Sequence, residues 1–119
     1  MSFDDFIRNF FSRRRNPQLA GLESFLATHK GVEGYIEPQT ATQPTTLLLV
    51  DRDGLSARAA VRDPQDAVAF CERSSIPVYD AAVVGYPRRM IGGPGDARPQ
   101  QDIDEEIADL ERRLRERGS

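Results

Sequence analysis

The sequence is poor in residues that bind metals or form disulfides. It contains one cysteine, Cys71, and one histidine, His29. A single cysteine cannot form an intramolecular disulfide, and clusters of cysteine and histidine that bind zinc are excluded. We therefore expect no metal and no other cofactor, and a reduced, cytoplasmic setting.

Long hydrophobic runs are also lacking. No segment approaches the roughly 20 apolar residues that cross a bilayer. The first residues lack the order of basic, apolar and small residues that is typical of a secretion signal. We expect a cytoplasmic protein, with peripheral attachment to the inner face of the membrane as its closest contact with lipid.

The charge is unevenly distributed, and the body of the chain has no basic cluster. Residues 1–15 carry two acids and four arginines, whereas residues 91–119 carry eight acids and five arginines. A protein that neutralises nucleic-acid phosphates needs a clustered basic face. The composition therefore argues against a nucleic-acid partner.

Helical and strand-like segments alternate along the chain. Asn16-Pro17 and Asp63-Pro64 are typical of helix starts. One helix is therefore predicted from Asn16-Pro17 to Gly31, and another from Asp63-Pro64 to Arg73. Strands are predicted where apolar and β-branched residues run between turns, at 35–37, 45–50, 56–61 and 76–79. Residues 81–86 either extend the last strand or form another after a bend.

This element order, α-β-β-β-α-β, predicts an α+β, two-layer domain with a small, mostly antiparallel sheet and flanking N- and C-terminal helices. The predicted segments are an amphipathic basic helix at 1–15, the core domain at 16–90, a flexible linker at 91–101 and an interaction helix at 102–119. Glycine and proline gather in the linker, where the chain buries too little apolar surface to order itself.

The string at 47–54 resembles the nucleophile motif of haloacid dehalogenase-type phosphatases, because an apolar strand ends in Asp51-Arg52-Asp53-Gly54. The resemblance implies Asp51 as the attacking group. The parallel sheet of that family needs crossovers of a dozen or more residues, yet the next predicted strand follows within a few residues. We therefore interpret the motif as a hairpin turn.

The element order also resembles the core of restriction-endonuclease-like nucleases. Those enzymes carry an acidic residue on the second strand and an E-x-K pair on the third, which bind the metal. The third predicted strand here, Ser56 to Val61, carries no acidic residue. The resemblance therefore implies a catalytically inactive nuclease-like module at most.

The remaining candidates for chemistry are His29 and Cys71. Each falls on the apolar side of a predicted helix, where a structural histidine or a buried, inert thiol is more common than a reactive one. We expect no catalytic residue, so the chain is predicted not to be an enzyme.

The first predicted helix has a wide apolar face beside a basic cluster. A free helix should not expose such a face to water. Three alternatives cover it: an anionic membrane surface, the core of the domain, or a groove on a partner protein. The residues concerned are Phe3, Phe6, Ile7, Phe10, Phe11, Arg13, Arg14 and Arg15.

The last predicted helix has a narrow apolar seam with spacings of 4, 3 and 4 residues. Such a stripe suits packing against another helix, but two heptads are short for a stable coiled coil. Weak homo-oligomerisation, docking onto a protein partner, and packing back on the chain's own domain remain open. The seam residues are Ile103, Ile107, Leu110 and Leu114.

The loop after residue 84 combines an aromatic ring with two guanidinium groups. Tyr86, Arg88 and Arg89 could together bind a carboxylate or a phosphate, and the alternative is a solvated surface loop. If they do converge, the chain is a small-ligand or anion-binding regulatory domain.

Four strings of this chain resemble those of small, uncharacterised actinobacterial proteins: Gly34 to Pro38, Thr45 to Val50, Ile76 to Asp80 and Val84 to Met90. The resemblance spans residues 34–90 and implies an intracellular bacterial protein with no assigned activity. Taken together, these features predict a non-catalytic accessory or adaptor protein that docks onto a complex, with a protein partner.

Overall fold

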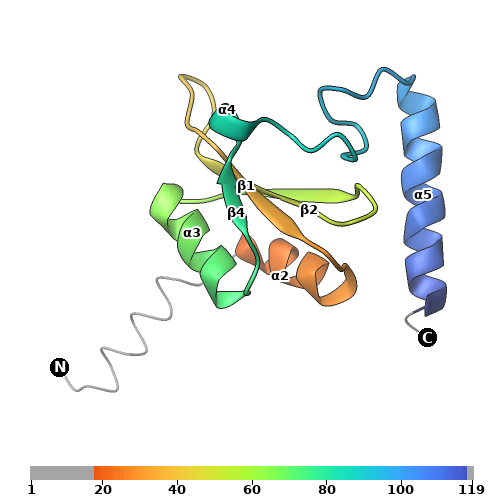
Figure 1. The fold of residues 1–119 in the computed structure, drawn as a ribbon, viewed down its shortest axis with the longest axis horizontal. Helices are drawn as coiled ribbons and strands as arrows, with labels where there is room; N and C mark the ends of the chain where they lie inside the picture. The colour runs from red at the N-terminus through yellow and green to blue at the C-terminus, as the bar shows by residue number, and fades with distance from the viewer. Residues whose placement is uncertain (1–17, 118–119) are drawn as a thin grey trace.

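The computed structural model describes residues 18–117 and confirms the α+β class. Figure 1 shows a small twisted sheet with helices packed around it. The order α-β-β-β-α-β is confirmed for the central domain. The elements are α2 (Leu19–Thr28), β1 (Glu33–Glu37), β2 (Thr46–Val50), β3 (Ser56–Ala60), α3 (Pro64–Arg73), β4 (Val78–Asp80), α4 (Ala81–Val84) and α5 (Gln100–Arg117).

The sheet is mixed but mostly antiparallel, with the strand order β3-β2-β1-β4. β1 pairs with β2, and β2 with β3, in antiparallel register. β4 pairs with β1 in parallel, with Tyr79 opposite Tyr35. The parallel pairing follows from α3, which carries the chain from one edge of the sheet to the other before β4 begins.

β2 is a central strand with apolar residues on both faces, as its unbroken apolar sequence predicts. Leu47 and Leu49 belong to the main core, which contains residues of α2 and α3. Leu48 and Val50 belong to a smaller cluster on the other face, beneath Met90 and the start of α4. The sheet therefore has one face covered by two helices and another that is covered only in part.

α3 is built as its sequence predicts. The Asp63 carboxylate accepts a hydrogen bond from the Asp66 backbone N–H at 2.8 Å, and Pro64 occupies the first turn. α3 buries Ala67, Phe70 and Cys71 against the sheet. Asp63 thus satisfies one of the backbone donors that a helix start leaves unpaired.

The prediction of a strand at residues 81–86 is wrong, because Ala81–Val84 forms the short helix α4. The Asp80 carboxylate accepts from the Ala82 N–H at 2.9 Å and caps this turn. Gly85 ends it with a φ of 77°. A local hydrogen bond from an aspartate therefore outweighs the strand propensity of the two valines.

Residues 85–99 connect α4 to α5. Met90 and Ile91 are buried, and the Ile91 N–H donates to the Gly54 carbonyl oxygen at 2.9 Å. Turns follow, and α5 begins at Gln100, two residues before the predicted start. α5 lies at the side of the domain (Figure 1).

The predicted N-terminal helix at 1–15 lies outside the described residues, together with all its apolar and basic side chains. Within residues 18–117, no helix is long and apolar enough to cross a membrane.

Candidate functional site

The D-x-D-G string forms a turn, as predicted from its short distance to the next strand. Asp51 is 1% exposed, and its Oδ1 accepts hydrogen bonds from the N–H groups of Asp53 and Leu55, each at 2.9 Å. Gly54 N–H donates to the Asp51 carbonyl oxygen at 3.2 Å, and its φ is 92°. Gly54 supplies a backbone conformation that other residues rarely adopt.

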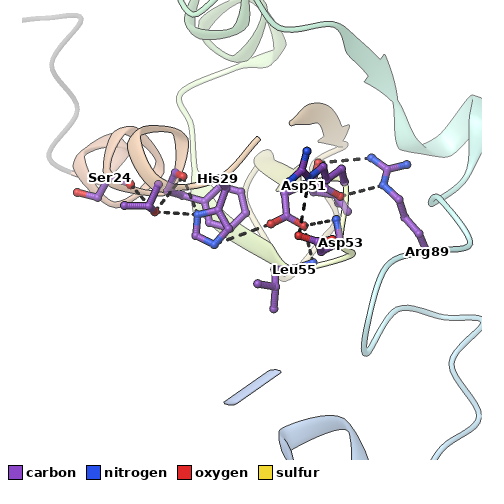
Figure 2. A network of polar contacts seen from close by, with 10 residues as sticks. Ser24, His29, Asp51, Asp53, Leu55 and Arg89 are labelled. Carbon is purple, nitrogen blue, oxygen red and sulfur yellow. Dashed lines mark hydrogen bonds and ion pairs between the residues drawn. The ribbon is translucent and has the colours of Figure 1, made fainter. Parts of the chain in front are cut away.

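Asp51 also lies between two other parts of the chain (Figure 2). On one side, Nε2 of His29 is 3.9 Å from Asp51 Oδ2. On the other, Nε of Arg89 donates to the Asp51 carbonyl oxygen at 2.8 Å. This turn therefore holds the end of α2 and the segment after α4 against the sheet.

These contacts make Asp51 a structural residue. Desolvation by burial raises its pKa above the usual range, although the two N–H groups and His29 oppose this. An attacking carboxylate needs an open approach for its substrate, whereas this side chain is enclosed and its Oδ1 is occupied. The geometry supports the hairpin-turn interpretation over the phosphatase one.

The side chains of His29 and Cys71 both pack against other residues of the domain. The His29 ring stacks on Phe25 with centroids 3.8 Å apart, and its Nδ1 donates to the Phe25 carbonyl oxygen at 2.8 Å. Cys71 is fully buried, and burial raises the pKa of its thiol to about 11. A thiol with that pKa is almost entirely protonated near pH 7 and so a poor nucleophile.

A second polar cluster lies on the partly covered face of the sheet, centred on Glu37 of β1. Arg58 of β3 donates to both carboxylate oxygens, from Nε at 2.5 Å and from Nη2 at 3.0 Å. Tyr86 O–H donates to Oε2 at 2.5 Å, and Thr46 O–H donates to Oε1 at 2.8 Å. The cluster thus joins three strands and the loop after α4.

These hydrogen bonds decide the charge of the cluster. Burial alone raises the pKa of Glu37, but hydrogen bonds from Arg58, Tyr86 and Thr46 outweigh it and lower the pKa below the usual value. The Glu37 carboxylate raises the pKa of Arg58 in return. Glu37 and Arg58 therefore form an ion pair at neutral pH.

This shift makes part of the stability depend on pH. Because the folded protein lowers the pKa of Glu37, its contribution is present above the unfolded value of about 4.5 and is lost as the pH falls through the folded value. We expect Glu37→Gln to flatten the loss of stability that wild type shows as the pH falls below about 4.5. Urea unfolding at several pH values measures this.

Glu72→Gln is the matched control, because Glu72 lies exposed on α3. It should leave the wild-type pH dependence unchanged. If the free energy of unfolding depends on pH equally in wild type and in Glu37→Gln, the assigned role of Glu37 is contradicted.

The structure separates the three residues of the predicted anion site. Tyr86 binds Glu37, whereas the Arg89 guanidinium binds Glu33 and the carbonyl oxygen of Asp51. Arg88 is exposed and lines a hollow of about 350 Å³ together with Arg89, next to α5. Tyr86 lines other hollows, with Arg58 and with Glu33.

The exposed large hydrophobic side chains of the described residues lie in one short stretch. Tyr79 is 39% exposed, Val83 is 79% exposed and Val84 is 57% exposed. They lie on β4 and α4, next to a hollow of about 190 Å³ lined by all three tyrosines of the chain, with Pro87 and Val84. We call Tyr79, Val83 and Val84 the α4 patch.

The seam of the last helix faces the chain's own domain. Ile103 is buried, and Ile107, Leu110 and Leu114 pack against the main core. This arrangement corresponds to the fold-back alternative. α5 packs lightly, since the last three of these side chains keep part of their surface exposed.

Sequence reasoning missed both Glu37 with Arg58 and the α4 patch. Glu37 and Arg58 are 21 residues apart and lie on strands that do not pair with each other, so no spacing signals their contact. Val83 and Val84 fall in the segment predicted as strand, which forms α4 instead. An aspartate followed by two alanines was the one available signal of a capped turn.

The nuclease interpretation gains no support from the site. β3 carries Arg58 where an active enzyme of that class would carry acidic metal ligands. Within residues 18–117, no group of three or more histidine, cysteine or acidic residues is placed to hold a metal ion.

No protein-family model, curated protein or solved structure matches this chain. The resemblance to actinobacterial proteins therefore stays a prediction.

Proposed function

We propose that this chain is a non-catalytic adaptor of the cytoplasm that binds a protein partner through the α4 patch. The observation that carries the proposal is the exposure of Val83 and Val84, two adjacent aliphatic side chains on a four-residue helix. Apolar side chains grouped on a surface are typical of interaction sites, whereas isolated ones are not. Tyr79 adds an aromatic ring to the group.

The edge of the sheet formed by β4 also favours a docking surface at the α4 patch. β4 is the outermost strand beyond β1, so one side of its backbone has no neighbouring strand within the sheet. A partner can add an extended segment to such an edge and bury apolar side chains beside it. The α4 patch directly follows this edge in the chain.

Val83→Asp should weaken partner binding by about tenfold or more, because a charge would be buried in the centre of the interface. The partner can be captured by a photo-crosslinking amino acid placed at position 83 in the producing cell. Binding of the identified partner to wild type and to Val83→Asp is then measured by calorimetry.

Ala108→Asp is the matched control, because Ala108 is exposed on α5, away from the patch. Both substitutions should change the free energy of unfolding by no more than about 0.5 kcal/mol. If crosslinkers at positions 83 and 108 capture the same proteins, the α4 patch is not the docking surface. The same conclusion follows if Val83→Asp binds the partner as tightly as wild type.

Attachment of the N-terminal segment to an anionic membrane is the further part of the proposal, and it rests on sequence alone. Phe6 and Phe10 supply apolar surface and Arg13 to Arg15 supply positive charge. Flotation of the full chain with anionic liposomes, and its loss in Phe6→Asp, would support attachment. A full chain that stays at the bottom of the gradient would contradict it.

A further inference from the structure

A cleft of about 540 Å³ lies beside the Glu37 cluster, between the loop after β1 and α4. Its polar lining residues are Glu37, Thr40, Gln43, Thr46, Arg58 and Tyr86. Prolines and alanines form most of the remaining wall, and the volume matches that of small-molecule sites. The apolar lining residues are Pro38, Pro44, Ala81 and Ala82.

The cleft contains a guanidinium that is already oriented. Arg58 is 49% exposed, yet Glu37 fixes it through two hydrogen bonds from one edge of the guanidinium, Nε and Nη2. Tyr86 also interacts with this guanidinium. A guanidinium carries five N–H donors, so these contacts together with the two to Glu37 do not use all of them, and a ligand can bind the remainder. Orientation before binding lowers the entropy that a ligand must overcome.

The cluster around Arg58 is held by several hydrogen bonds. The Glu37 carboxylate is only 16% exposed and receives further hydrogen bonds from Tyr86 and Thr46. Every donor and acceptor in this group comes from a different strand or loop, so the position of the guanidinium is set by the fold. A planar guanidinium matches the two oxygens of a carboxylate.

We propose that this cleft binds a small organic acid, with its carboxylate on Arg58 and an apolar body against the prolines and alanines. Gln43 brings a side-chain amide to the same cleft and can donate to the second carboxylate oxygen. The site is distinct from the α4 patch, because Ala81 and Ala82 line the cleft while Val83 and Val84 lie on the exposed surface. The inference therefore stands independently of the proposed docking function.

The test is a titration of the full chain followed by nuclear magnetic resonance of the backbone amides. The probes are N-acetyl-leucine, which has a carboxylate and an apolar body, its neutral amide N-acetyl-leucinamide, and inorganic phosphate. We expect saturable shifts at Arg58, Thr46 and Tyr86 with the acid, and binding of the amide weaker by about tenfold or more.

Two variants separate loss of binding from loss of folding. Arg58→Gln should weaken binding of the acid by about tenfold or more. Ala82→Phe should fill the cleft while leaving the Arg58 guanidinium in place. Arg88→Gln is the matched control, since Arg88 is exposed and lines another hollow. It should bind like wild type.

Equal binding of the acid and its amide would overturn the role of Arg58, and unchanged binding in Ala82→Phe would overturn the assignment to the cleft. Phosphate that binds as tightly as the acid would overturn the requirement for an apolar body. Absence of saturable shifts with all three probes would overturn the site itself.

Discussion

Gly54→Ala destabilises the domain by about 3–5 kcal/mol, because two penalties coincide at this position. The φ of Gly54 is 92°, a conformation that costs a non-glycine residue about 1–2 kcal/mol. An added Cβ would also lie 2.0 Å from the Arg89 carbonyl oxygen and 3.2 Å from the Ile91 side chain. Urea unfolding measures the change.

The steric penalty is the larger, because the neighbouring atom belongs to the backbone and cannot rotate away. The segment at 89–91 would have to move from the turn, and the hydrogen bond from Ile91 N–H to the Gly54 carbonyl oxygen would break. Met90 and Ile91, both buried, would lose part of their packing.

Gly85→Ala separates the two penalties. Gly85 has a φ of 77°, but no atom lies within 4 Å of the position of an added Cβ. Its ψ of −165° lies in a region that is essentially restricted to glycine, so Gly85→Ala should cost only the conformational part, about 1–3 kcal/mol. Equal losses in Gly54→Ala and Gly85→Ala would show that residues 89–91 do not press on the turn.

Asp51→Ala should destabilise the domain by about 2–5 kcal/mol, because it leaves two backbone donors without their acceptor. Oδ1 of Asp51 accepts from both Asp53 and Leu55, and the Leu55 bond is buried. The substitution also opens space beside His29. In urea unfolding, this loss of stability would lower the midpoint concentration and leave the dependence of the free energy on urea concentration unchanged.

Asp51→Asn is the matched variant, since its side-chain oxygen can accept the same two hydrogen bonds without carrying a charge. We expect it to stay within about 1 kcal/mol of wild type at neutral pH, because the cost of burying a charge is removed while only the 3.9 Å contact with His29 is weakened. A loss in Asp51→Asn as large as that in Asp51→Ala would mean that the charge, rather than the turn, holds this site together.

The sign of the pH effect at Asp51 is opposite to that at Glu37. Burial raises the pKa of Asp51, so the folded protein binds its proton more tightly than the unfolded chain does. This contribution to stability is therefore present at low pH and is lost as the pH rises from the unfolded value through the folded one. Asp51→Asn removes that dependence, whereas Glu37→Gln removes the opposite one.

The α+β class, the order of elements and the hairpin at Asp53-Gly54 are predictable from the amino-acid sequence. These features depend on local signals. Asp63-Pro64 caps a helix within one turn, the unbroken apolar run at 47–50 marks a central strand, and a glycine after an aspartate favours a tight turn. Each signal acts over a few residues, so neighbours in the chain suffice to show it.

Which side chains meet and which are left exposed depends on how distant segments pack. Arg58 reaches Glu37 across an intervening strand, and Arg89 turns to Glu33 and Asp51 instead of joining Tyr86. The seam of α5 faces its own domain, and Val83 remains in solvent. Such contacts depend on strand order and on the packing of distant segments, which local periodicity does not encode.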